Sequence, residues 1–184
     1  MRYPQTLAAI ALGAVLAVPA AYAQLIRNPD QKIDNAEAAA MKQLAQANLS
    51  EIEAGKAAAA KAQSPDVKQF AQKMVNDHQQ MLNELEALAK RKGVALPQSA
   101  SLKDKAQAKL AERATGAEFD KKYMEEMVKD HQKDAKETQD LAAKAKDPDF
   151  KAAVQKAHAT IEEHLKLAQR VASHHGAAVG GTSK

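Results

Sequence analysis

The sequence predicts an all-α protein whose mature part is a four-helix bundle. Four long segments place apolar residues three and four positions apart, which is the spacing of one face of an α-helix. Proline at the start or glycine at the end marks several of their boundaries, as is typical of helices. Residues of high helix propensity dominate the composition, and only 3% of the residues are aromatic.

The first 23 residues have the three parts of a secretory signal peptide. Met1 and Arg2 give a positive start, residues 7–18 form an unbroken run of apolar and small residues, and Ala21-Tyr22-Ala23 is a small-x-small cleavage site. The run is shorter than the roughly 20 residues of a membrane span, and the chain has no cysteine for lipid attachment. We therefore expect a periplasmic protein, secreted via this signal peptide and not inserted into the membrane after cleavage. An uncleaved N-terminal anchor is the alternative.

The rest of the chain divides into a short N-terminal extension at residues 24–34, a bundle at 35–175 and a flexible tail at 176–184. The four predicted helices span residues 35–62, 65–92, 117–145 and 148–174. Ser64-Pro65-Asp66 and Asp147-Pro148-Asp149 each combine an N-cap residue, a proline at the first helical position and an early acid. Gly93 suits the left-handed conformation that ends many helices.

An internal repeat predicts how the helices are connected. Residues 60–73 resemble residues 143–156, so the chain reads as two similar helical hairpins. Each predicted helix is about 42 Å long at 1.5 Å per residue. The linker at 93–116, with a short helix of its own at about 102–113, is long enough to cross that distance. One long crossover between two hairpins is the ferritin-like layout; an up-down bundle with an enlarged loop is the alternative.

One polar layer interrupts the apolar faces of these helices. His78, His131 and His164 each lie in the middle of an apolar stripe, and Glu51 lies at the edge of the first stripe. Counted from the two turns, all four residues fall about 20 to 24 Å along helices that are about 42 Å long. Three imidazoles and a carboxylate at one level could form a shell for a divalent metal such as Zn, Fe or Cu.

Other interpretations of these residues remain open. The same side chains could form a structural polar network in a non-catalytic scaffold or a stress-related interaction protein. Met74 and Met81 flank His78, and thioethers beside imidazoles would suit Cu(I). A ferroxidase is disfavoured, because Val75 and Ile161 stand where a ferritin-like di-iron site has a glutamate three residues before its histidine. We see no nucleophile motif or phosphate-binding loop, so an enzyme is not indicated.

The composition also bears on partners. The formal net charge is only +4, and lysines are interleaved with acidic residues, so we expect no nucleic-acid binding. The sequence identifies no protein partner and leaves a homodimer open.

Several short segments, taken together, resemble a known family. They are Asn48–Gly55, Met74–His78, Leu96-Pro97, Gly116–Asp120 with Tyr123, and Glu163–Leu165. As a set they resemble a widespread bacterial family of unknown function, exported and often labelled as outer-membrane proteins. The resemblance covers about residues 35–171 and implies a ferritin-like bundle and export, but no established activity. Nothing else in the sequence supports the outer-membrane label.

Overall fold

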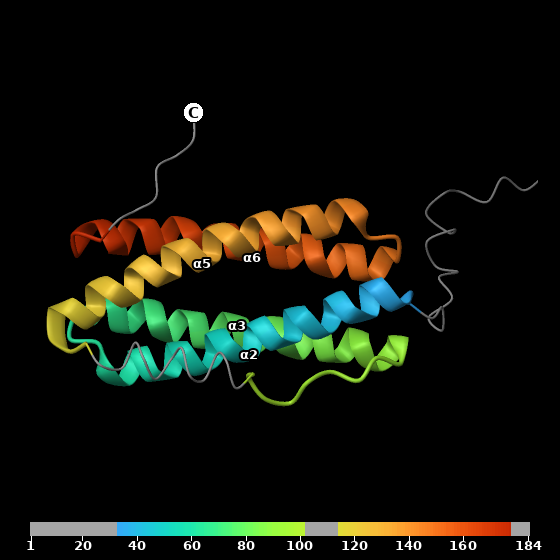
Figure 1. The fold of residues 1–184 in the computed structure, drawn as a ribbon, viewed down its shortest axis with the longest axis horizontal. Helices are drawn as coiled ribbons and strands as arrows, with labels where there is room; N and C mark the ends of the chain where they lie inside the picture. Colours follow the sequence, from blue (N-terminus) through green and yellow to red (C-terminus); the bar gives the residue numbers. More distant parts are fainter. Residues whose placement is uncertain (1–32, 102–113, 178–184) are drawn as a thin grey trace, which may run out of the picture.

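The computed structural model describes residues 33–101 and 114–177, which form four long α-helices and contain no strand. The helices are α2 (Asn35–Lys61), α3 (Pro65–Lys92), α5 (Gly116–Lys144) and α6 (Pro148–His174) (Figure 1). The predicted all-α, four-helix fold is confirmed, and each helix begins and ends within one residue of its predicted bounds. None of these helices combines the length and hydropathy that a membrane crossing requires.

Some predicted segments lie outside the described residues. These are the signal peptide at 1–23, nearly all of the extension at 24–34, the short crossover helix at 102–113 and residues 178–184 of the predicted tail.

Hydrogen bonds at the two ends of the bundle establish the topology. Asp120 on α5 accepts hydrogen bonds from the backbone N–H groups of Gln63 and Ser64 in the α2–α3 turn, at 2.9 and 2.7 Å. At the other end, Glu37 on α2 accepts from the N–H groups of Lys146 and Asp147 in the α5–α6 turn. The two turns therefore lie at opposite ends, and α3 and α5 run in the same direction (Figure 1). The connection from α3 to α5 must run the length of the bundle, so the crossover layout is confirmed and the up-down alternative is excluded.

The two hairpins are related by a pseudo-twofold symmetry. Pro65 and Pro148 begin the second helix of each hairpin, so equivalent positions are 83 residues apart (148 − 65). Glu37 and Asp120, which cap each other's turns, are equivalent in this sense. The ion pairs at the ends follow the same rule, because Asp66 contacts His175 at 3.1 Å and Asp149 contacts Lys92 at 3.2 Å. The contacts thus support the internal repeat seen in the sequence.

The starts of the two second helices differ in one detail. The Asp147 side chain accepts hydrogen bonds from the N–H groups of Asp149 and Phe150 and so caps α6. Ser64 occupies the N-cap position of α3, but its side chain makes no capping hydrogen bond. Its backbone N–H is instead held by Asp120. Gly93 ends α3 with φ = 69°, the left-handed conformation expected from the sequence.

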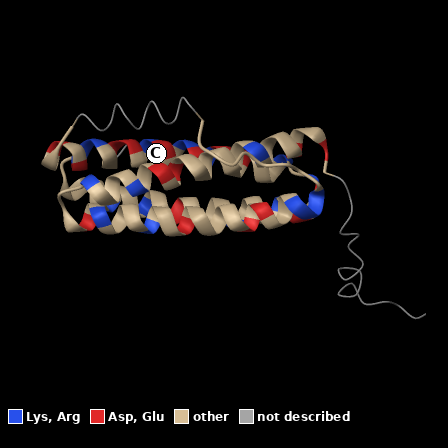
Figure 2. Cartoon of the chain, turned by 90° about the horizontal axis from the view of Figure 1, so that it is seen from below, with Lys and Arg blue, Asp and Glu red and all other residues tan. Residues whose placement is uncertain are grey.

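The apolar core consists of two clusters on either side of the histidine level. One cluster lies toward the α2–α3 turn and includes Phe70, Met74 and Met124. The other lies toward the α5–α6 turn and includes Met41, Leu85 and Phe150. Basic and acidic residues are interspersed along the helices in Figure 2. The fold thus places one polar layer between two apolar halves.

Candidate metal centre

Three histidines from three helices meet at the middle of the bundle. His78 comes from α3, His131 from α5 and His164 from α6, and the ring centroids lie 5.3 to 5.8 Å apart. One ring nitrogen of each histidine lies within 4.8 Å of those of the other two. The rings are sealed from solvent, since His131 and His164 are 0% exposed and His78 is 4% exposed. The structure therefore brings together the three histidines that the sequence placed at one level.

Neighbouring groups fix the tautomer of two of these rings. Asn48 donates a hydrogen bond from its amide nitrogen to the Leu44 carbonyl, which turns its amide oxygen toward His78. That oxygen can only accept, so His78 Nδ1 carries the hydrogen across their 3.0 Å contact. In the same way, His131 Nδ1 donates to the Met127 carbonyl at 2.9 Å. In both rings the Nε2 atom is therefore the one that keeps a lone pair.

A carboxylate fixes the third ring. His164 Nε2 donates to Asp77 Oδ2 at 2.8 Å, and Lys73 contacts the same oxygen at 2.6 Å. Burial acts to raise the pKa of Asp77, but the hydrogen bonds from Lys73 and His164 outweigh it and hold that pKa below its usual value. The ionised carboxylate accepts the His164 hydrogen, so Nδ1 keeps the lone pair. Carboxylates and carbonyls in this role are the usual partners of metal-binding histidines.

The remaining nitrogen of each ring has no partner. His78 Nε2, His131 Nε2 and His164 Nδ1 are all buried and make no hydrogen bond. Buried polar atoms are nearly always satisfied, so three exceptions in one layer require an explanation. These three atoms are also the basic nitrogens, which are the form of imidazole that binds a metal ion.

Burial keeps the three imidazoles neutral. It lowers the pKa of His131 to about 4, with a further contribution from His164. It also lowers the pKa of His78 well below the usual value, because the neighbouring His131 and His164 add to the effect. For His164 burial lowers the pKa and Asp77 partly opposes it. At neutral pH all three rings are therefore ready to act as ligands.

The spacing of the rings is close to that of a metal shell. With metal–nitrogen bonds of about 2.0–2.1 Å, tetrahedral geometry places ligand nitrogens about 3.4 Å apart. One nitrogen from each ring lies within 4.8 Å of one nitrogen of each other ring, so a bound metal would bring the ligand atoms closer together by up to about 1.4 Å. Three histidines would leave a fourth coordination position for water or another ligand.

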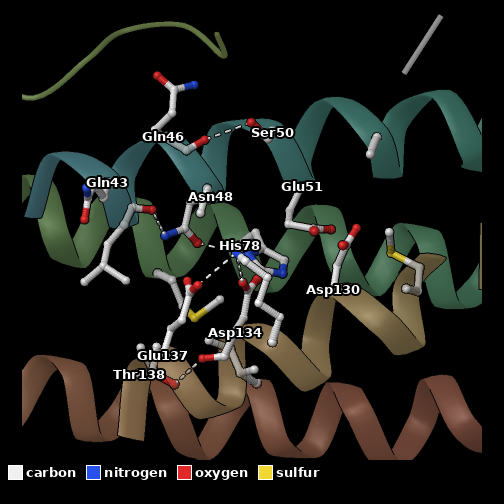
Figure 3. A pocket seen from close by; sticks show the side chains of 18 of the residues that line it. Gln43, Gln46, Asn48, Ser50, Glu51, His78, Asp130, Asp134, Glu137 and Thr138 are labelled. Atoms are coloured by element: carbon white, nitrogen blue, oxygen red, sulfur yellow. Dashed lines mark hydrogen bonds and ion pairs between the residues drawn. The ribbon is translucent and has the colours of Figure 1, made fainter. Parts of the chain in front are cut away.

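Glu51, the fourth residue that the sequence singled out, lies to one side of this group. The described residues contain one cluster with metal-binding geometry, and its members are the three histidines alone. Glu51 instead faces a groove between α2 and α5, called here the α2–α5 groove, whose walls include Asn48, Glu51, His78, Tyr123, Asp130 and Asp134 (Figure 3). Burial, reinforced by Asp130 and Asp134, raises the pKa of Glu51 to about 8.

Comparisons with known proteins identify the family of this chain. Residues 23–171 match the model of a family described as "Domain of unknown function (DUF4142)". The chain belongs to this family. A comparison with curated proteins gives no match. The fold of this DUF4142 domain is similar to the crystal structure of a "putative spore coat protein" from Bacillus halodurans C-125, with a TM-score of 0.68. That match covers 85% of this chain and 99% of the other at 16% identity, so it bears on the fold alone.

Sequence reasoning did not assign roles to the residues that orient the rings of this DUF4142 domain. Asp77 adjoins His78 in the sequence, and neighbouring helix positions point about 100° apart, so the two side chains are not expected to face the same neighbour. That divergence is what lets Asp77 reach His164 on α6 while His78 faces inward. Asn48 lies in the apolar stripe of α2. A polar residue at such a position is the sequence feature that could have indicated its role. The Met127 carbonyl left no signal, because every helical residue has one.

Proposed function

We propose that this DUF4142 domain binds one transition-metal ion at mid-bundle through His78 Nε2, His131 Nε2 and His164 Nδ1. The observation that carries the proposal is the pattern of hydrogen bonds around the rings. In each ring one nitrogen is held by an acceptor, and the other, basic nitrogen is buried without a partner. A metal ion between the rings would satisfy all three atoms at once.

A purely structural network explains the same layer less well. In such a network each imidazole would donate to, or accept from, a neighbour in the layer. Here the only donor of each ring is directed outward, to Asn48, Met127 or Asp77. No hydrogen remains to link one ring to the next. Ordered water would be the alternative occupant of the layer.

The ligand set favours a borderline metal. Neutral imidazole nitrogens suit Zn, Cu and Fe, whereas Mg and Ca prefer oxygen ligands. Met74, Met124 and Met127 pack in the neighbouring apolar cluster. The proposal therefore rests on imidazole nitrogens and uses no thioether.

We test the centre by metal content and thermal stability. Protein purified without an affinity tag is loaded with Zn²⁺, Cu²⁺ or Fe²⁺, dialysed, and analysed for bound metal beside a His131→Gln/His164→Gln variant. The matched control is His174→Gln, whose side chain is 63% exposed. We expect about one metal per chain in the wild type and the control and almost none in the double variant, with a rise in Tm only where metal binds. Equal, substoichiometric metal in all three proteins, with no change in Tm, would leave the structural network as the better account.

We further propose that the domain acts in the periplasm. The support is the three-part pattern of residues 1–23, because their charge, apolar run and small-x-small site match an export signal. Cell fractionation and N-terminal sequencing test the idea. A mature chain that begins at Gln24 in the periplasmic fraction is the expected result, and a chain in the cytoplasm that retains Met1 would contradict it.

A further inference from the structure

The proposed centre is sealed, so a metal ion needs a route to it. His131 and His164 are 0% exposed and do not line the α2–α5 groove, whereas His78 does. The groove has a cavity volume of about 1330 Å³, far more than the roughly 30 Å³ that one water molecule occupies. A hydrated cation can therefore approach His78 from this side of the bundle.

A buried carboxyl group faces the same groove. Glu51 is only 9% exposed, and its Oε2 atom has no hydrogen-bond partner. Figure 3 shows its carboxylate extending from α2 toward that of Asp130 on α5. A buried carboxylate without a donor is unfavourable, and the nearby negative charge adds to the cost. A cation between the two helices would relieve both effects.

A further carboxylate extends this acidic wall. Asp134 is one helical turn beyond Asp130 and also lines the groove. Burial, opposed by Lys133 and reinforced by Asp130, raises its pKa to about 6. Lys133 contacts Asp134 at 3.7 Å and Glu137 at 3.1 Å. The single positive charge of Lys133 does not balance the carboxyl groups of Glu51, Asp130 and Asp134.

We propose that Glu51, Asp130 and Asp134 form an entry port that takes up a hydrated divalent cation and passes it to His78. This inference rests on the proposed metal centre. In the port the cation exchanges some of its water ligands for carboxylate oxygens, and Glu51 releases its proton to solvent. The imidazole nitrogens then replace the carboxylates. The carboxylates are not members of the histidine cluster. The cation therefore passes through the port and does not remain bound there.

The test measures both rates of Zn²⁺ exchange in the full-length protein. Stopped-flow mixing with a colorimetric zinc dye gives the association rate, and transfer of bound Zn²⁺ to excess chelator gives the dissociation rate. The variant is Glu51→Gln/Asp134→Asn, which relieves repulsion and should fold at least as stably; its Tm is measured as a check. The control is Glu86→Gln/Glu118→Gln, which removes two negative charges from exposed positions outside the groove.

A port changes the association and dissociation rates of the metal by the same factor, because entry and exit use the same route. The affinity therefore stays nearly the same. We expect both rates in the port variant to fall by about tenfold or more, within the range that electrostatic steering supplies. The Kd should stay within about threefold of the wild-type value, and the control should exchange like the wild type. Unchanged rates in the port variant would overturn the port alone. Faster dissociation with a weaker Kd would also overturn it, since Glu51 would then be a ligand. A wild type that binds no Zn²⁺ would overturn the metal centre and the port together.

Discussion

Asp77 shows how a single residue can serve a partner distant in the sequence. Its carboxylate lies beside His78 in the chain, yet it accepts the hydrogen bond of His164 on α6 and pairs with Lys73 one turn earlier. It therefore fixes which nitrogen of His164 keeps its lone pair. A residue of this kind changes the affinity of a metal site without touching the metal.

We expect Asp77→Asn to weaken Zn²⁺ binding about 10- to 100-fold, as loss of such partners does in other metal sites. The amide can still accept a hydrogen bond, but the negative charge that makes His164 a better ligand is lost. Competition with a chelator of known affinity measures the change. Asp140→Asn is the control, because Asp140 pairs with Lys136 in the same i,i+4 arrangement at 2.8 Å. Equal affinities in the two variants would show that Asp77 does not act on the centre.

Glu51 gives a second prediction at this scale, one of pH-dependent stability. Its folded pKa is about 8, above the usual 4.5. The folded protein therefore binds this proton more tightly than the unfolded chain does, and stability is lost as the pH rises from about 5 to 8. Glutamine has no proton to lose. In metal-free protein, we expect the Tm of Glu51→Gln to exceed that of the wild type by a margin that grows over this range.

The expected margin at pH 8 is roughly 10 °C, since a pKa raised from 4.5 to about 8 corresponds to about 4 kcal/mol at that pH. Each kcal/mol corresponds to about 2–4 °C for a chain of this size. Thermal melts by circular dichroism at pH 5, 6.5 and 8 provide the measurement. Glu118→Gln is the control, because the Glu118 side chain is 67% exposed. A margin independent of pH would mean that Glu51 is not held protonated by burial.

The residue scale also shows what the sequence could and could not predict about the site. His78, His131 and His164 were predictable, because distance along a helix from a turn fixes the level of a residue. The displacement of Glu51 into the groove was not. It depends on how far α2 stands from α5 and how each helix is rotated, and neither quantity follows from the spacing of residues within one helix.

At the scale of elements, the close approach of α2 and α3 depends on Gly55. A Cβ atom at this position would lie 2.8 Å from Val75 Cγ2 and 3.0 Å from the Ala71 carbonyl oxygen. The Val75 side chain would have to move, and the backbone at Ala71 would have to give by a few tenths of an ångström. Glycine within a helix ordinarily costs about 0.5–1 kcal/mol relative to alanine, so its presence here reflects packing between helices.

We expect Gly55→Ala to lower the free energy of unfolding by about 1–2 kcal/mol. The close contacts of the new methyl group destabilise the fold by more than the higher helix propensity of alanine stabilises it. Urea titrations measure the effect. Adding Val75→Ala removes the nearer clash, so the double variant should be more stable than the sum of the two single changes predicts. A Gly55→Ala protein more stable than the wild type would show that α2 and α3 are not in close contact at this point.

The elements were the most predictable level of this protein. Pro65, Pro148 and Gly93 act on the backbone through their own allowed dihedral angles, so helix ends could be located from single residues. The reciprocal capping by Glu37 and Asp120 was not predictable. Both residues look like ordinary acids near the start of a helix, and their role depends on which turn the other hairpin places beside them.

The whole molecule combines a symmetric scaffold with an asymmetric centre. Under the pseudo-twofold relation His131 is equivalent to Asn48, and both side chains donate to the carbonyl one turn earlier, at 2.9 and 2.8 Å. His78 and His164, however, are equivalent to Ile161 and Met81. The internal repeat thus accounts for the hairpins and their caps. The three-histidine centre arises from substitutions that differ between the halves, so the internal repeat could not have predicted it.

Burial within the whole bundle should make metal binding resistant to acid. Three exposed imidazoles with the usual pKa of about 6.5 would each lose about tenfold in neutral form between pH 7.5 and 5.5, or about 1000-fold together. Here burial lowers the pKa of His131 to about 4, and those of His78 and His164 are lowered as well. The ligands therefore stay neutral while exposed histidines become charged. Asp77, with its lowered pKa, stays ionised over the same range.

We expect the Zn²⁺ affinity to fall by less than about tenfold between pH 7.5 and 5.5, in contrast to the roughly 1000-fold loss of an exposed three-histidine site. Equilibrium dialysis at each pH measures it, with an exposed polyhistidine peptide as the reference. The stability of the metal-free protein should depend on pH more strongly. Its unfolded histidines take up protons below pH 6.5 and its buried ones do not, so its stability should fall as the pH drops toward 4. A loss of Zn²⁺ that parallels the peptide would show that the imidazoles are open to solvent protons, and the sealed centre would then be the wrong description of this bundle.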